Sequence, residues 1–302
     1  MLISNKANLG LTYALLVFIW STTPLAIVWS ITDIYHMWAL ALRFFLALPL
    51  AFALLYVFKV HFPYDPRSIH SYIAGACSFI GSQFFTYLAT SYLSSGMLAL
   101  MFGLAPIMAG LIGHFVFKQY LALLQWFGLC IAVMGLAIIC LGGSEHQVHP
   151  IGIALMLISV MVYSASIFWV KKVNAPLDPI AQASGSILVS SLVAACALPF
   201  IWQHAPTHLP NAKALFGLFY AVVMASLLAM FCYFKLLKKI KATTLSLTTV
   251  LTPMLAMVFG AMLNHEQLTM MVFVGASILL LGLLVYFIPD LKASRDLASK
   301  SS

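Results

Sequence analysis

Arg43 lies inside the apolar stretch 37–58 and is the clearest ionisable side chain in such a position. A charge held among apolar residues in a membrane is costly, so it is a functional hypothesis by default. The sequence leaves two kinds of role open. Arg43 can reach a polar surface with its long side chain or pair with Asp33 nearby, and it can instead bind a substrate or act in a gate.

His114 and Glu266 are the remaining side chains that could carry a proton, because no Asp or Glu lies in the middle of an apolar stretch. Histidine titrates near neutral pH. Near a helix end, however, a histidine often packs against its neighbours, and a carboxylate often caps the helix that follows. Proton coupling through His114 or Glu266 is therefore one hypothesis, beside facilitated diffusion and exchange.

Amide, hydroxyl and aromatic side chains recur inside the apolar stretches. Gln83 and Tyr87 are one helical turn apart and share a helix face. Aromatic rings suit the apolar part of a small solute, and amides and hydroxyls suit its polar ends. The same residue types also join membrane helices and gather at lipid interfaces. The predicted substrate cavity consists of Trp20, Ser21, Gln83, Tyr87, Tyr163, Ser166, Trp169, Gln182, Tyr233 and Thr249.

The composition predicts a helical membrane protein. The 302 residues are 63% hydrophobic and 7% charged, whereas a soluble domain carries about 25% charged residues. The apolar stretches have the length of about 20 residues that a helix needs to cross a bilayer. The five cysteines lie in these stretches without a CxxC pair, so they predict neither disulfides nor a metal site. The formal charge of +8 comes from short polar gaps, which favours a lipid bilayer over nucleic acid as the partner.

Polar or charged breaks divide the chain into ten apolar stretches. The longest break, Gly142–Pro150, lies at the centre. The ten predicted spans are 8–30, 37–58, 70–90, 95–117, 123–142, 150–171, 178–201, 213–236, 242–263 and 269–288.

The basic residues predict the orientation of these spans. Lys and Arg accumulate in cytoplasmic loops. With a cytoplasmic N-terminus, every Lys and Arg except Arg43 and Lys213 falls on the cytoplasmic side. We therefore expect both termini in the cytoplasm.

The second half of the chain repeats features of the first. Pro253, Gly260, Gly275 and Gly282 fall on Pro106, Gly113, Gly128 and Gly135 when the numbering is shifted by 147. Five spans per copy is an odd number, so the copies must insert with opposite orientation, as in many secondary transporters. We expect an all-α protein with one repeat at 1–145 and a second at 146–302. Pro106 and Pro253 should kink their helices, and with Arg43 they are the candidates for gating.

The order of several short motifs resembles the EamA-type members of the drug/metabolite transporter superfamily, over essentially the whole chain. One position departs from that pattern, because Gln119 stands where the family carries an acidic residue, while its partner Glu266 is kept. The resemblance implies ten helices, a bacterial inner membrane and export of amino acids, related metabolites or drugs. The motifs are Trp20-Ser21, Thr22-Thr23-Pro24, Leu42-Arg43-Phe44, Tyr87, Tyr92, Ser94-Ser95, Pro106, Tyr163-Ser164, Pro253, His265-Glu266 and Leu268.

Together these features predict a secondary transporter that exports a small metabolite, such as an amino acid, by alternating access, with no cofactor or metal. A multidrug exporter and a facilitative channel are the alternatives, and a non-transporting membrane protein is a weaker one. An intramembrane enzyme has no paired carboxylates, HExxH or GxSxG motif to support it. Monomer and homodimer both remain open.

Overall fold

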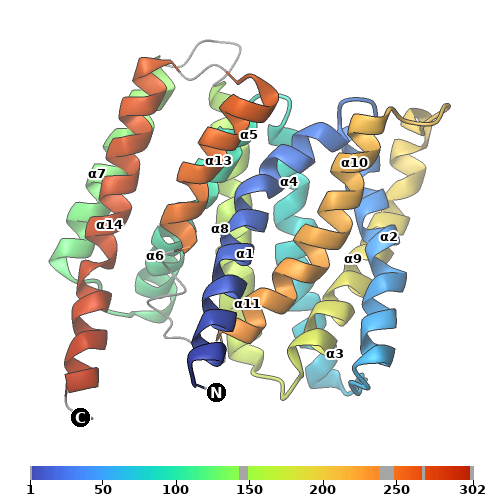
Figure 1. Cartoon of the computed structure of the whole chain (residues 1–302), viewed down its shortest axis with the longest axis horizontal. Helices are drawn as coiled ribbons and strands as arrows, with labels where there is room; N and C mark the ends of the chain where they lie inside the picture. Colours follow the sequence, from blue (N-terminus) through green and yellow to red (C-terminus); the bar gives the residue numbers. More distant parts are fainter. Residues whose placement is uncertain (1, 143–148, 238–247, 267–268, 300–302) are drawn as a thin grey trace.

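A bundle of helices forms the computed structural model, which describes residues 2–142, 149–237, 248–266 and 269–299. The two chain ends lie at the same end of the bundle (Figure 1). The centre of the chain and the start of the predicted ninth span lie outside the described residues. The helices are α1 (Leu2–Ser30), α2 (His36–Val57), α3 (Pro66–Ala76), η1 (Cys77–Gly81), α4 (Ser82–Ala89), α5 (Ser95–Phe102), α6 (Ala105–Phe117), α7 (Leu123–Gly142), α8 (Pro150–Val173), α9 (Pro179–Ile201), η2 (Trp202–His204), α10 (Ala212–Tyr220), η3 (Ala221–Leu228), α11 (Ala229–Leu237), α13 (Thr248–Asn264) and α14 (Met270–Ser299).

Within the described residues, eight helical stretches are long and apolar enough to cross a membrane. The all-helical membrane architecture is therefore confirmed, while the number ten is not reached by this measure. The ninth predicted span is represented by the shorter apolar helix Thr248–Asn264. The third, Pro66–Ala89, begins with the polar residues Arg67, Ser68, His70 and Ser71, which lower its hydropathy.

Two helical regions, α3–η1–α4 and α10–η3–α11, contain π-helical segments at corresponding places in the two halves of the chain. The segment η1 covers Cys77–Gly81, and η3 covers Ala221–Leu228. A shift of 147 residues carries the first of these onto positions 224–228, inside the second. Such wide turns are frequent at functional sites.

Glycines allow α7 and α14 to pack closely along their length at one side of the bundle (Figure 1). A Cβ on Gly128 would lie 2.7 Å from the carbonyl oxygen of Gly282, and a Cβ on Gly135 would lie 2.6 Å from that of Gly275. At both positions a side chain would overlap the backbone of the facing helix, so only glycine allows this close approach. The two pairs exchange members under the 147-residue shift, because 128 corresponds to 275 and 135 to 282.

The same helix-ending turn closes α6 and α13. Lys118 and His265 both adopt left-handed backbone, with φ of 54° and 52°. The backbone N–H of Gln119 donates to Gly113 at 3.0 Å, and that of Glu266 donates to Gly260 at 3.2 Å. Each bond closes a turn one residue wider than the six-to-one bond of a Schellman turn, with the same left-handed residue after the helix. The two turns are again 147 residues apart.

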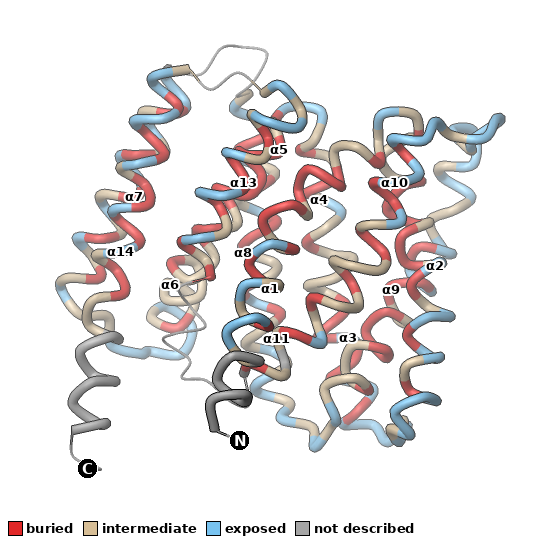
Figure 2. The backbone as a smooth tube through the Cα atoms, in the orientation of Figure 1, coloured by how far each residue is buried: buried red, intermediate tan, exposed pale blue. Residues whose placement is uncertain are grey.

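Buried residues line the contacts between helices, and exposed ones cover the outer faces of α2, α7 and α14 (Figure 2). The largest apolar cluster joins α5, α7, α8, α13 and α14 around Leu98, Met101 and Leu283. A second cluster joins α1, α2, α9 and α10 around Phe44 and Tyr87. The exposed apolar faces are those expected of helices solvated by lipid tails.

Candidate functional site

Aromatic rings from four helical rods meet inside the bundle. Trp20 of α1 lies 5.6 Å from Tyr233 of α11, and Phe102 of α5 lies 6.1 Å from Tyr163 of α8, measured between ring centroids. The α1 and α10 helices are also joined by a hydrogen bond of 2.5 Å between the hydroxyl groups of Thr22 and Tyr220. Trp20, Tyr163 and Tyr233 are partly buried. The structure thus brings Trp20 and Tyr233 of the predicted cavity into contact.

An apolar cavity of about 550 Å³ lies between α2, the start of α9, and the η3–α11 rod. This volume suits a small organic solute. Ser226 and Ser184 are polar residues of its wall, and Asp178 and Lys235 also line it. Asp178 accepts a hydrogen bond from the backbone N–H of Ile180 and caps α9.

A second cleft, of about 830 Å³, separates α6 from α8. Trp169, predicted for the substrate cavity, lines this cleft with Phe117, Phe168 and Lys172. The rings of Phe117 and Phe168 stack at 5.0 Å, so the two helices still touch at its edge. Neither Trp20 nor Tyr233 lines the cleft that Trp169 lines.

Several predicted cavity residues hold helices together. The Ser21 hydroxyl donates to Val17 in its own helix, and that of Ser166 donates to the carbonyl of Ala74 at 2.6 Å. Gln182 accepts from the Ser71 hydroxyl at 2.5 Å and donates to the Ser71 carbonyl at 2.9 Å. Thr249 lies in the first turn of α13 and is partly buried. The bonds of Ser166 and Gln182 are the interhelical bonds that membrane interfaces favour, while the Ser21 bond lies within α1.

Arg43 is buried, with 5% of its surface accessible. Its Nε donates to the Ser226 hydroxyl of η3 at 3.1 Å, and its Nη1 donates to Oε1 of Gln83 in α4 at 3.3 Å. Placing an arginine at the centre of a membrane helix costs about 2.5–3.5 kcal/mol. Tyr87, one turn beyond Gln83, is fully buried, and its hydroxyl has no hydrogen-bond partner among the described residues.

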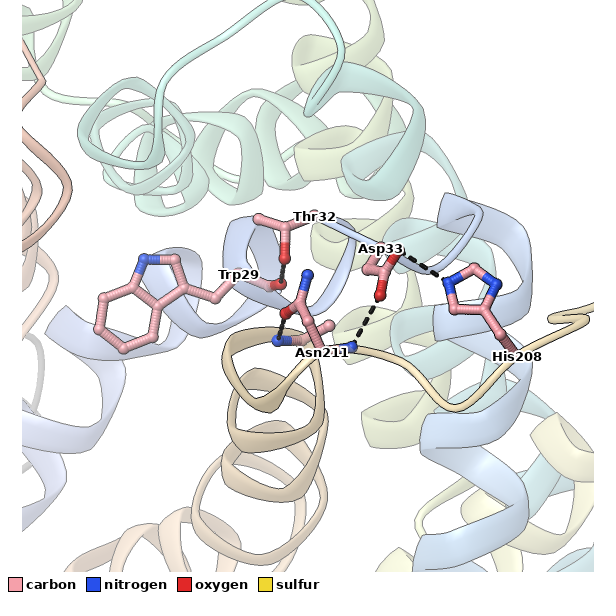
Figure 3. A network of polar contacts seen from close by, with 6 residues as sticks. Trp29, Thr32, Asp33, His208 and Asn211 are labelled. Atoms are coloured by element: carbon pink, nitrogen blue, oxygen red, sulfur yellow. Dashed lines mark hydrogen bonds and ion pairs between the residues drawn. The ribbon is translucent and has the colours of Figure 1, made fainter.

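Asp33 does not pair with Arg43, so that suggestion from the sequence is wrong. It binds the start of the α10 segment instead (Figure 3). One carboxylate oxygen accepts from the Asn211 backbone N–H at 2.7 Å, and the other lies 3.2 Å from Nε2 of His208. The Asn211 hydrogen bond, and then the His208 contact, hold the pKa of Asp33 below its ordinary value. Asn211 and His208 lie in a loop next to that of Asp33, outside the apolar region, whereas Arg43 is buried within it.

Glu266 accepts four hydrogen bonds and joins the end of α13 to the start of α5. Oε1 accepts from the backbone N–H and hydroxyl of Ser95, at 3.0 and 2.6 Å, and from the Asn264 amide at 3.1 Å. Oε2 accepts from the backbone N–H of Gly96 at 3.1 Å. The carboxylate therefore caps α5, where the positive end of the helix dipole favours it. The sequence suggests a cap on the following helix, but the capped helix is 171 residues earlier.

Asn264 extends the Glu266 contacts to the first helix. Its side-chain oxygen accepts from the indole N–H of Trp29 at 3.0 Å and from Lys213 at 3.4 Å. The Lys213 ammonium also lies 5.4 Å from the centre of the Trp29 ring. Trp29 and Asn264 were not predicted from the sequence, Ser95 was named there only within the Ser94-Ser95 motif, and no spacing indicates that the three meet.

His114 and the two prolines occupy different local settings. The His114 Nδ1 lies 2.8 Å from the carbonyl oxygen of Gln119, across the turn that ends α6. Pro106 stands in the first turn of α6, just after the break at Gly103 and Leu104. Pro253 lies inside the described helix α13. The break between α5 and α6 lies close to α13 there, since a Cβ on Gly103 would lie 3.1 Å from Cγ of Pro253.

The sequence and the fold both match known proteins. The model of the EamA-like transporter family matches residues 8–141 and 150–288. The chain is 22% identical to the uncharacterized transporter YoaV of Bacillus subtilis, over 92% of this chain and 95% of that protein. It is 21% identical to the protein PagO of Salmonella typhimurium, over 83% and 84%. A solved crystal structure superposes with a TM-score of 0.66 at 15% identity, covering 92% of this chain and 96% of the other.

These matches agree with the several apolar helices and support a multi-pass membrane transporter. The family match spans both halves of the chain, on either side of the central break. The resemblance seen in the short motifs of the sequence is therefore confirmed. This chain belongs to the EamA-like transporter family.

Proposed function

We propose that the protein is a secondary transporter built from two inverted five-helix halves, which exports a small metabolite, such as an amino acid, by alternating access. The observation that carries this proposal is the repeated turn at Gly113–Gln119 and Gly260–Glu266. The helix α6 ends near the side of the bundle where both chain termini lie, and α13 ends at the opposite side (Figure 1). One local structure at opposite ends of the bundle is what inverted repeats produce.

The two ends of the bundle differ in a way that supports alternating access. At one end, Glu266 and Asn264 of the second half hold Ser95 and Trp29 of the first. The cleft of about 830 Å³ opens between α6 and α8, beside Lys172. The halves are therefore in contact at the Glu266 end, while a cleft separates α6 of the first half from α8 of the second. In a transport cycle the Glu266 contacts must break as the closed end opens.

Counterflow in proteoliposomes tests the proposal. Vesicles containing the purified protein and one unlabelled amino acid or metabolite should accumulate the same labelled compound, because a carrier exchanges solutes through one site. Saturable accumulation with at least one compound of a broad panel is expected. Downhill flux without counterflow would instead indicate a channel, and absence of both across the panel would contradict transport.

A matched pair of tyrosine variants distinguishes a specific role of the Trp20–Tyr233 contact in transport from a general loss of folding. Tyr233→Ala removes the ring that contacts Trp20 and should lower the counterflow rate by about tenfold or more, the size expected when a stacking contact of roughly 1.5 kcal/mol is lost. Tyr56→Ala removes a tyrosine that is 86% exposed on α2 and should leave the rate unchanged. Equal effects of the two variants on the counterflow rate would exclude a specific role for the Trp20–Tyr233 contact.

We also propose an inner-membrane location with both termini in the cytoplasm. The start of α3 and the ends of α6 and α8 lie on the side of the chain termini (Figure 1). These helix ends carry Arg67, Lys118, Lys171 and Lys172, as cytoplasmic loops favour. A reporter fused after Lys172 should be active in the cytoplasm, and one fused after Asn211 should be active outside it. The reverse pattern would overturn this orientation.

A further inference from the structure

Arg43 has more hydrogen-bond donors than the protein uses. A guanidinium carries five N–H groups, and two of these donate, to Ser226 and Gln83. Among the residues that the structure describes, no other acceptor contacts it. The residue as a whole keeps 5% of its surface accessible. The group is therefore built into the bundle with donors to spare.

The charge of Arg43 also lacks a counter-ion among the described side chains. The acids there have other partners: Asp33 binds Asn211, Asp65 caps α3, Asp178 caps α9, and Glu266 caps α5. Both partners of Arg43 are neutral, a hydroxyl and an amide. A buried cation is stabilised mainly by an anion that meets it with good hydrogen-bond geometry. An anion supplied from outside the chain would meet this need.

The neighbours of Arg43 form a partial binding site. Ser226 lies in the π-helical segment η3, where its hydroxyl also donates to the carbonyl of Ala221 at 2.9 Å. Gln83 is the second residue after the other π-helical segment, η1. Tyr87, on the same face as Gln83, has an unpaired buried hydroxyl. Wide helical turns and unsatisfied polar groups together indicate a ligand site more than a packing contact.

Ser226, the partner of the Arg43 Nε, forms part of the wall of the cavity of about 550 Å³, and Arg43 lies behind that serine without lining the cavity itself. The rest of that wall is mainly apolar, with Ile187, Val223 and Leu227 close to the serine in sequence or space. A ligand there would have an apolar body in the cavity and a polar end at Ser226. The charge behind Ser226 is positive and Lys235 also lines the cavity, so a polar end that accepts hydrogen bonds and carries negative charge is favoured there.

We propose that Arg43 binds the carboxylate of a transported apolar amino acid whose side chain occupies this cavity. The proposal rests on the transport function proposed above and narrows its substrate class. Arginine suits this role because its planar fork matches a carboxylate in two parallel hydrogen bonds. Ser226 and Gln83 hold the guanidinium in place until the substrate arrives, and Tyr87 supplies a further hydroxyl on the Gln83 face.

The test compares carboxylates with their neutral amides on the purified protein. Binding of leucine and phenylalanine, and of leucinamide and phenylalaninamide, is measured by the shift in melting temperature over a concentration series. The carboxylates should bind at least about tenfold more tightly, as loss of one charge-assisted pair predicts. Equal binding of acid and amide, or binding of neither, would overturn the proposal.

Three variants assign the preference to Arg43. Arg43→Gln should remove it, and Arg43→Lys should keep part of it, because a lysine retains the charge without the fork. Arg67→Gln is the matched control, since Arg67 is exposed and donates to the Val173 carbonyl at the end of α8. It should retain the full preference. A preference that survives in Arg43→Gln would overturn the proposal.

Gln83→Glu covers the case in which Arg43→Gln does not fold. This change places a carboxylate where an amide oxygen now lies 3.3 Å from Nη1. The protein should become more heat-stable and lose its preference for carboxylates, because its own acid occupies the arginine. A purely structural arginine would predict the added stability with ligand binding unchanged. Binding is measured without transport, so counterflow with other compounds can succeed even where this proposal fails.

Discussion

Glu266→Ala should lower the melting temperature and reduce counterflow by about tenfold or more. The change removes all four hydrogen bonds to the carboxylate and leaves the backbone N–H groups of Ser95 and Gly96 without their partner. Loss of a helix cap costs about 0.5–2 kcal/mol, and hydrogen bonds to a charged group contribute about 1.5–3 kcal/mol. The contact joins the two halves, so its loss should also favour the open form of this end. Thermal unfolding and counterflow on the same preparation measure both effects.

Two variants show whether the effect belongs to this contact. Gln119→Ala alters the equivalent turn in the first half, where no described side chain accepts from or donates to the Gln119 amide, and it should change little. Glu266→Gln keeps one acceptor oxygen but loses the charge, so it should fall between alanine and the wild type. A Glu266→Ala protein with unchanged stability and transport would exclude the gate role proposed for this carboxylate.

Gly282→Leu should have the largest effect on folding. A Cβ at this position would lie 2.7 Å from the Gly128 carbonyl and 2.8 Å from Cα of Ala132, so α7 and α14 would have to separate along much of their length. Overpacking of this kind commonly costs 1–3 kcal/mol, and more where backbone must move. We expect loss of the monodisperse peak in size-exclusion chromatography, or a melting temperature lowered by several degrees.

Gly10→Leu is the matched control for this prediction. Gly10 is an exposed helical glycine with no heavy atom within 4 Å of the position that a Cβ would take. Leucine there improves helix propensity and should leave stability unchanged or slightly raised. If both leucine variants behave alike, close packing of α7 on α14 is not a main source of stability.

Much of the helix pattern could be predicted from the sequence, because lipid requires long apolar runs and the breaks between them are polar. The loop before Asp65 and the loop after Val173 show this, since both fall at predicted breaks. The spacing of Pro106, Gly128 and their counterparts predicted a repeat, and the two helix-ending turns have the same spacing of 147 residues.

The partners of the functional side chains could not be predicted in the same way. Asp33 was the acid nearest to Arg43 in the sequence, yet Gln83 and Ser226 contact the arginine. Glu266 binds a helix start 171 residues away, which no local pattern encodes. Hydropathy also cannot tell which face of a uniformly apolar helix lines a cavity. Ser166 and Gln182 were therefore predicted to line a cavity from their residue types, whereas in the structure they form interhelical bonds.

The glycine contacts between α7 and α14 have a consequence for the origin of the chain. Gly128 meets Gly282, and Gly135 meets Gly275, while 128 corresponds to 275 and 135 to 282. Under the inverted repeat proposed above, these four glycines would have been two in a single five-helix precursor. Two copies inserted in opposite directions would have matched each glycine of one copy with the other glycine of its mate, which is the form of a self-complementary dimer interface. Fusion of the two genes would then have required a linker and no new contact at this helix pair.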